Sequence, residues 1–452
     1  MKRRGLTTMH PTRLGLPLLA AFGLLAGCSP TGGGNPPPPA APVEPASPGP
    51  AGTPTATATA PTAPTPAGAT APTTATPAAG SREEAFARAR KAIDQGLHWL
   101  RQQQAEDGSY GNYPGVTAMV LSAFLQSHRK YREEDGPFIR RATEYLAALA
   151  KPNGAIFDKN LPTYNTALAV LALHQTGNPA YREIIKKGQL FLIGIQAAES
   201  NQYRPQDKFY GGIGYGSSER PDLPNLQFAI EALALSDYDG DRAVFERAIK
   251  FIERCQNRSE SNDQEWAGED GGFIYQPGSS KAGGTKSYGS MTHAGIMSLM
   301  YSNVDRNDPR VQDALGWIKA NWDLETHPGM GLAGLYFYYH TLAKALSVLG
   351  VTEITDDRGQ THDWAVELID AVLARQDPAG FWVNSDANYW ESNKLLASAR
   401  ALLALEGALG LTHEAIASRV TPTPAAQPGA PAAAQPGAAT SPPPPPAPTP
   451  AP

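Results

Sequence analysis

Apolar side chains recur every three or four residues along several stretches of the chain, with polar residues between them. In the first stretch the apolar positions are Phe86, Ala89, Ile93, Leu97 and Leu100. The same spacing returns in residues 244–252 and 366–373. This period matches the turn of an α-helix, so each stretch is predicted to be an amphipathic helix with one buried face.

A second kind of stretch is apolar on nearly every side. Thr166 to Leu173 and Ala401 to Leu405 are the clearest examples. A helix of this composition has to be covered on most sides. Half-buried helices that alternate with fully covered ones predict two concentric helical layers, and no stretch of 81–415 has a convincing strand pattern.

The helices are separated by loops that place glycine beside an aromatic or aliphatic residue. Six of these loops can be aligned on the anchor residues Gly108, Gly154, Gly212, Gly272, Gly329 and Gly380. Successive anchors lie 46, 58, 60, 57 and 51 residues apart. A period of this size is typical of an array of helix pairs, so the chain is predicted to contain six such units.

The last loop is part of a recognisable motif. Gln376 to Trp382 resembles the Gln-x-x-x-Gly-x-Trp repeat of squalene and other triterpene cyclases, and Gln104 to Tyr110 has the same spacing with Tyr in place of Trp. The other four units are degenerate. The wider resemblance, to the prenyltransferase and squalene-cyclase-like superfamily, implies an all-α fold: an α/α toroid of six inner and six outer helices around a central cavity. It implies a mainly structural role for the motif.

The two ends of the chain differ from its middle in composition. Of the 42 prolines, 14 lie in residues 31–80 and 13 in residues 421–452. Such segments carry too few large apolar side chains to form a core. We therefore expect a disordered linker over 28–80, the toroid over 81–418 and a disordered Pro/Ala-rich tail over 419–452.

The first 27 residues are predicted to be a signal peptide. Basic residues precede an apolar run from Leu14 to Ala26, which is too short to cross a bilayer as a helix. The run ends in Leu25-Ala26-Gly27-Cys28, which looks like the lipobox of bacterial lipoproteins. That resemblance implies lipidation of Cys28 and attachment to a membrane of the bacterial cell envelope, facing the periplasm or the exterior. The alternative is an ordinary secretory signal with a chance cysteine.

Charge and cysteine content narrow the function. Residues 81–420 hold 34 basic and 42 acidic side chains, which gives a net charge of about −8. This balance disfavours a nucleic-acid partner, which needs a basic face. Cys28 and Cys255 are the only cysteines, so no disulfide framework is expected.

One candidate site lies at the start of a predicted inner helix. Phe337 to Thr341 resembles the Tyr-His-Thr segment of protein prenyltransferase β-subunits, where the histidine ligates zinc; His340 holds that position here. The family takes its other ligands from an Asp-x-Cys, and residues 286–293 contain neither Asp nor Cys. A catalytic zinc needs about three protein ligands. No cofactor is therefore expected, and His293 with His340 is the most that a partial zinc site could offer.

Carboxylates are the other candidates for a catalytic role. The Asp-x-Asp-Asp motif by which triterpene cyclases protonate an alkene does not occur, and Asp237 to Asp241 is typical of a solvated turn. The catalytic candidates are His340, Asp386 and Glu391, the two carboxylates as an acid and base pair. A helix N-terminus is the alternative place for Glu391.

These residues give a specific geometric expectation. His293, Tyr339, His340 and Trp390 should line one cavity, with Lys344 one turn deeper and paired with a carboxylate such as Glu391. The favoured function is an envelope-anchored toroid that binds an apolar ligand (isoprenoid-, lipid- or peptide-like) in this cavity. The alternatives are an active prenyltransferase- or cyclase-type enzyme and a noncatalytic scaffold for protein partners.

Overall fold

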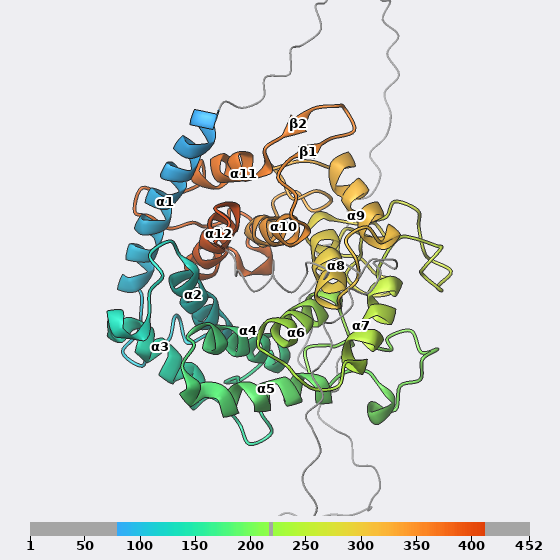
Figure 1. Ribbon diagram of the computed structural model, residues 1–452, viewed down its shortest axis with the longest axis horizontal. Helices are drawn as coiled ribbons and strands as arrows, with labels where there is room; N and C mark the ends of the chain where they lie inside the picture. The colour runs from blue at the N-terminus through green and yellow to red at the C-terminus, as the bar shows by residue number, and fades with distance from the viewer. Residues whose placement is uncertain (1–78, 217–219, 412–452) are drawn as a thin grey trace, which may run out of the picture. The chain divides into compact units, whose positions relative to one another are not determined.

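The computed structural model of the protein describes residues 79–216 and 220–411. Within these residues the chain forms twelve α-helices that alternate between two layers (Figure 1). The inner helices are α2 (Pro114–Gln126), α4 (Pro162–Gln175), α6 (Leu223–Leu235), α8 (Gly289–Tyr301), α10 (Leu335–Leu349) and α12 (Lys394–Ala408). The outer helices are α1 (Ala79–Gln102), α3 (Pro137–Ala148), α5 (Arg182–Gly194), α7 (Ala243–Arg254), α9 (Pro309–Ala320) and α11 (Trp364–Leu373).

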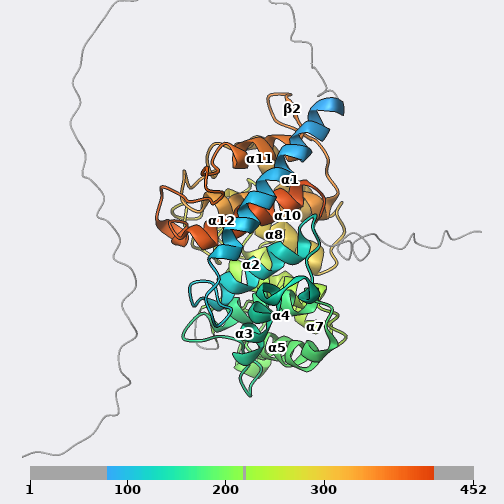
Figure 2. The same cartoon turned by 90° about the vertical axis from the view of Figure 1, so that its left-hand side faces the viewer.

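The inner helices form a closed ring. Each packs on the next inner helix along the chain, and α12 returns to pack on α2. The outer ring also reaches from end to end of the chain, because α1 packs on α11 and α12 (Figure 2). Every residue of α8 is buried, whereas α1 and α7 each keep one polar, exposed face. The two helical layers predicted from the apolar periodicity, and the α/α toroid implied by the resemblance, are therefore confirmed.

A small hairpin corrects the expectation that the domain contains no strand. β1 (Ile354–Thr355) pairs antiparallel with β2 (Thr361–His362) between α10 and α11. Each strand has two residues, too few for a period of two to be recognised in the sequence.

The repeated loops join neighbouring outer helices through one glycine each. Gly211 has a φ of +85°, and a methyl group built on it would lie 1.8 Å from the carbonyl oxygen of Arg247 on α7. Equivalent contacts to the next outer helix are made by Gly108, Gly154, Gly271 and Gly380, the last of which meets α1 and so closes the ring. The third and fourth anchors are thus Gly211 and Gly271, one residue before those predicted. We call these five contacts the outer seams.

A glutamine reinforces four of the outer seams. Gln376 donates to the carbonyls of Gly380 and of Ala92 on α1, and Gln104 bonds Gly108 and Phe138 in the same way. Gln196 and Gln256 do the same from 15 residues before Gly211 and Gly271, instead of four. Two of the units predicted to be degenerate therefore keep the glutamine contact across a longer loop.

Several expectations concern residues that the structure does not describe. The signal peptide, Cys28, the linker up to residue 78 and the tail from residue 412 lie outside the described residues. Within the part that is described, no helix is long and apolar enough to span a bilayer.

Candidate functional site

The inner helices enclose a cavity of about 360 Å³ at their N-terminal ends. All six contribute side chains from their first two turns or from the residue before the helix: Tyr113 and Val116, Leu161 and Tyr164, Asn225 and Phe228, Tyr288 and Met291, Gly334 and Phe337, Leu396 and Arg400. We call this the upper cavity. The proline at the start of α2, α4 and α6 suits this arrangement, since a first-turn N–H has no partner within its own helix.

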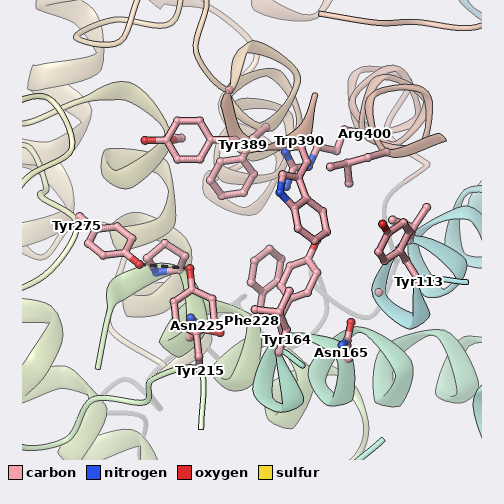
Figure 3. A pocket seen from close by; sticks show the side chains of 18 of the residues that line it. Tyr113, Tyr164, Asn165, Tyr215, Asn225, Phe228, Tyr275, Tyr389, Trp390 and Arg400 are labelled. Atoms are coloured by element: carbon pink, nitrogen blue, oxygen red, sulfur yellow. Dashed lines mark hydrogen bonds between the residues drawn. The ribbon is translucent and has the colours of Figure 1, made fainter. Parts of the chain in front are cut away.

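Aromatic side chains make up much of the wall. Nine Tyr, Phe and Trp residues line the upper cavity: Tyr113, Tyr164, Tyr215, Phe228, Tyr275, Tyr288, Phe337, Tyr389 and Trp390 (Figure 3). Phe228 contacts Tyr164 edge to face at 5.1 Å between ring centroids, and Tyr113 contacts Trp390 at 5.5 Å. The cavity is thus predominantly apolar, with a few polar groups in the wall.

Two aromatic residues stand in a strained backbone segment at the edge of the cavity. Tyr389 and Trp390 have φ values of +58° and +62°, in the left-handed region that L-residues rarely adopt. Their side chains are 43% and 50% exposed, although both line the cavity. Strain of this kind costs about 1–3 kcal/mol per residue and is concentrated at functional sites.

One part of the wall carries a buried polar network. Asp222 caps α6 by accepting from the Asn225 backbone N–H at 2.8 Å, and it accepts twice more from the Asn225 side chain. The Tyr275 hydroxyl lies near Asp222 and is 3.3 Å from the Tyr215 hydroxyl (Figure 3). Burial raises the pKa of Asp222 to about 6, although the nearby Tyr275 hydroxyl opposes this rise. Two tyrosine hydroxyls therefore connect the cavity with a buried carboxyl that titrates near neutral pH.

The sequence reading missed this network, although it left two signals. Tyr215 and Tyr275 occupy the same position after the paired glycines of the third and fourth units. Asp222 stands directly before Leu223-Pro224, which is a helix-start pattern.

Glu391 is fully buried, and its carboxylate is hydrogen-bonded to the start of α10. It accepts from the backbone N–H groups of Tyr336 and Phe337 at 3.1 and 2.7 Å, and it pairs with Arg400 at 3.0 Å. Asp386 lies in the loop before α12, where it accepts a hydrogen bond from the Asn388 backbone N–H. It does not line the upper cavity. The geometry fits the helix N-terminus interpretation of Glu391, not an acid and base pair with Asp386.

A second, smaller cavity of about 50 Å³ lies deeper between the inner helices. His340, Lys344 and Glu231 line it together with apolar side chains and the polar side chains of Ser122, Gln126 and Gln175, and Phe228 lines both cavities. We call it the lower chamber. The Lys344 ammonium is bonded to Glu231, so the predicted buried ion pair exists but its carboxylate comes from α6 and is not Glu391.

The expectation of one shared cavity for the candidate residues is therefore wrong in its geometry. Trp390 lines the upper cavity, while His340 and Lys344 line the lower chamber. His293 packs on the Tyr338 ring and bonds Thr341 at 3.2 Å, and Tyr339 donates to the Leu324 carbonyl. The reason is helical phase: Tyr339 is rotated by about 100° from its neighbour His340, away from the lumen.

Burial keeps the histidines of this region neutral. The pKa of His293 falls to about 3, and that of His327, which lines the upper cavity, to about 4. Burial also lowers the pKa of His340, helped by the charges of Lys344 and Arg400. Cys255 is buried at the end of α7, where burial raises the pKa of its thiol.

Neutral imidazoles can ligate zinc, but the other ligands of a zinc site were not found. Among the described residues, no three His, Cys, Asp or Glu side chains converge on a point where a metal ion could bind. His293 and His340 contact different parts of the structure, and the carboxylate that shares the lower chamber with His340, that of Glu231, is bonded to Lys344. The side chains present do not fit the zinc site of the protein prenyltransferases.

Several solved structures are similar to this chain. A variant of the type II terpene cyclase MstE from Scytonema, in complex with geranylgeranyl dihydroxybenzoate, is 13% identical, and the match covers 73% of this chain and 99% of that one with a TM-score of 0.48. An α-1,6-mannanase from Salegentibacter sp. HEL1_6 is 11% identical over 72% of this chain and 99% of its own, with a TM-score of 0.46. No protein-family model and no curated protein matches the chain. At this distance the likeness concerns the fold and says nothing about ligand or reaction.

Proposed function

We propose that this protein binds an apolar, isoprenoid- or lipid-like ligand in its upper cavity. The observation that carries the proposal is the wall itself: nine aromatic side chains around a partly open cavity of about 360 Å³. A cavity of this size is in the range of small-molecule sites, which are mainly apolar and contain a few placed polar groups. Aromatic faces contribute a large apolar area and lose little conformational entropy on binding.

The polar part of the wall gives the ligand an orientation. Tyr215, Tyr275 and Arg400 face the same space, and the positive ends of six helix dipoles point toward it. These groups favour an oxygen-bearing end group on the ligand. As part of the proposal, lipidation of Cys28 would hold the domain at a membrane of the bacterial envelope, where such ligands are found.

Tryptophan fluorescence tests the binding directly, because Trp390 stands at the edge of the cavity. Full-length protein would be titrated with farnesol, an isoprenoid alcohol, and with glycerol as a polar control. We expect saturable binding of farnesol alone. Isothermal titration calorimetry, which does not need the Trp390 reporter, should show this binding weakened at least tenfold in Trp390→Ala. The matched control is Trp266→Ala, at a tryptophan that does not line the cavity. Equal affinity of both variants and the wild type would contradict the proposal.

An active cyclase-type enzyme is the second candidate, and Asp222 favours it. A carboxyl with a pKa of about 6, linked through Tyr275 to Tyr215, can pass a proton toward the cavity. Gas chromatography of ligand extracted from the same titrations separates the two functions. Unchanged farnesol supports a binding protein; cyclised products that disappear in Asp222→Asn support an enzyme.

A further inference from the structure

The lower chamber lies next to the upper cavity, and Phe228 is the residue that lines both. Its ring contacts Tyr164 at 5.1 Å and Phe337 at 6.4 Å between centroids. It stands on α6 one turn before Glu231, and Phe337 stands on α10 one turn before His340. Because Phe228 and Phe337 are held at the same depth, an elongated ligand passing them would place its far end beside Glu231 and His340.

The charges of the lower chamber balance one another. The Lys344 ammonium is bonded to Glu231, and the Gln227 side-chain amide donates to the same carboxylate at 2.6 Å. A buried ion pair is tolerated when further hydrogen bonds satisfy it. The pair therefore leaves a polar surface with no net charge, which favours an uncharged polar group over an anion.

His340 supplies a polar group that lacks a partner, as does the side-chain oxygen of Gln175 in the same chamber. His340 is 8% exposed, lines the lower chamber, and makes no hydrogen bond through its ring nitrogens within residues 79–216 and 220–411. A neutral imidazole has one donor and one acceptor, the same pair of functions that a hydroxyl group offers. A buried polar ring without a partner costs stability unless something binds to it.

We propose that the lower chamber is a second subsite, which binds a terminal hydroxyl at the inner end of an elongated ligand through His340 and the Lys344–Glu231 pair. The chamber's volume of about 50 Å³ admits a hydroxyl or a few waters and excludes a bulky head group. This inference rests on the proposed function, since the ligand's apolar body occupies the upper cavity. Phe228 then separates the apolar body from the polar end.

Matched alcohols and diols test the subsite. Full-length protein would be titrated with 1-dodecanol and with 1,12-dodecanediol, using the Trp390 signal. Without a partner in the chamber, the second hydroxyl has to be desolvated and weakens binding. With a partner, we expect the diol to bind at least fivefold tighter than the alcohol. Tighter binding of the diol than of the alcohol therefore indicates a partner for the second hydroxyl, and weaker binding indicates that there is none.

Variants locate the effect. His340→Leu should abolish the preference for the diol, whereas His98→Leu, at an exposed histidine on α1, should keep it. The double variant Lys344→Met with Glu231→Gln removes both charges together and is the second probe should His340→Leu fail to fold. Circular dichroism would check the fold of each variant.

The outcomes separate the two proposals. If the wild type binds both compounds without preferring the diol, the second subsite is wrong and the proposed function stands. A preference that survives in both folded chamber variants also overturns it, since the hydroxyl then binds elsewhere. If neither compound nor farnesol binds, the proposed function itself has failed.

Discussion

The outer seams and the lumen of the toroid are built by opposite rules. At five seams a glycine with positive φ meets the backbone of the next outer helix, and at four of them a glutamine bridges the glycine's own carbonyl and a carbonyl of that next helix. In the lumen, by contrast, the inner helices present Met119, Leu168, Phe228, His340 and Leu403 to the lower chamber. The ring is closed by repeated backbone contacts, which leaves the lumen side chains free to differ.

The fifth repeated loop, which forms no outer seam, supports this comparison. Gly329, in the loop after α9, faces Tyr288 instead of α11. The contact to α11 is made by side chains: the Trp322 indole donates to Glu367 at 3.1 Å, and its ring packs on His362 of β2. The hairpin thus occupies the place where the regular contact is missing.

The largest effect should come from adding a methyl group at a seam. Gly211→Ala has to relieve both the positive φ and the 1.8 Å approach to Arg247. We expect a loss of about 3–5 kcal/mol in the free energy of unfolding, from left-handed strain and overpacking together. Gly283→Ala is the matched control, because its φ is +91° and nothing lies within 4 Å. It should lose only about 1–2 kcal/mol. Equal losses in urea denaturation would show that the seam contact does not matter.

The inner ring should show a pH-dependent effect of about 2 kcal/mol between pH 6.5 and 5, smaller than that of Gly211→Ala. The folded-state pKa of His293 is about 3, below its value of about 6.5 in an unfolded chain. The unfolded state therefore binds the extra proton first, and stability is complete above pH 6.5 and is lost as the pH falls toward 3. Each pH unit in this window should cost about 1.4 kcal/mol.

His293→Phe keeps a ring against Tyr338 and removes the titrating group. Between pH 6.5 and 5, its unfolding free energy should fall by about 1.4 kcal/mol less per pH unit than that of the wild type. His98→Phe should follow the wild type. The raised pKa of Asp222 makes the folded state more stable as the pH falls from 6 to 3.8, opposite to the effect of His293. This contribution is the same in the wild type and both variants. Identical slopes in His293→Phe and the wild type would refute the assignment.

The smallest effect on stability is expected in the lumen. Tyr215→Phe removes a hydroxyl whose contact with Tyr275 is long, at 3.3 Å, and which faces the upper cavity. We expect a change of at most about 1 kcal/mol in unfolding free energy, together with weaker farnesol binding. A loss as large as that of Gly211→Ala would remove the distinction between seam and lumen.

The periodicity of apolar residues was sufficient to predict the helices and their two layers. The spacing of apolar residues indicates whether one face of a helix or all of its faces are buried. The spacing of the glycines likewise predicted six units. It misplaced two anchors by one residue, since Gly211-Gly212 and Gly271-Gly272 offer two candidates each and only the backbone conformation selects one. Gln196 and Gln256 were missed because their loops insert residues between the glutamine and its glycine.

The sequence by itself therefore determined the elements, their alternation and the presence of a polar, aromatic lumen. Only the tertiary structure decided which of those residues meet. Tyr339 and His340 are neighbours in sequence, yet the helical turn sends them to different surroundings, whereas Lys344 and Glu231 are 113 residues apart and form one pair. Local spacing fixes the face of a helix on which a side chain lies; the partner on that face depends on how the ring closes.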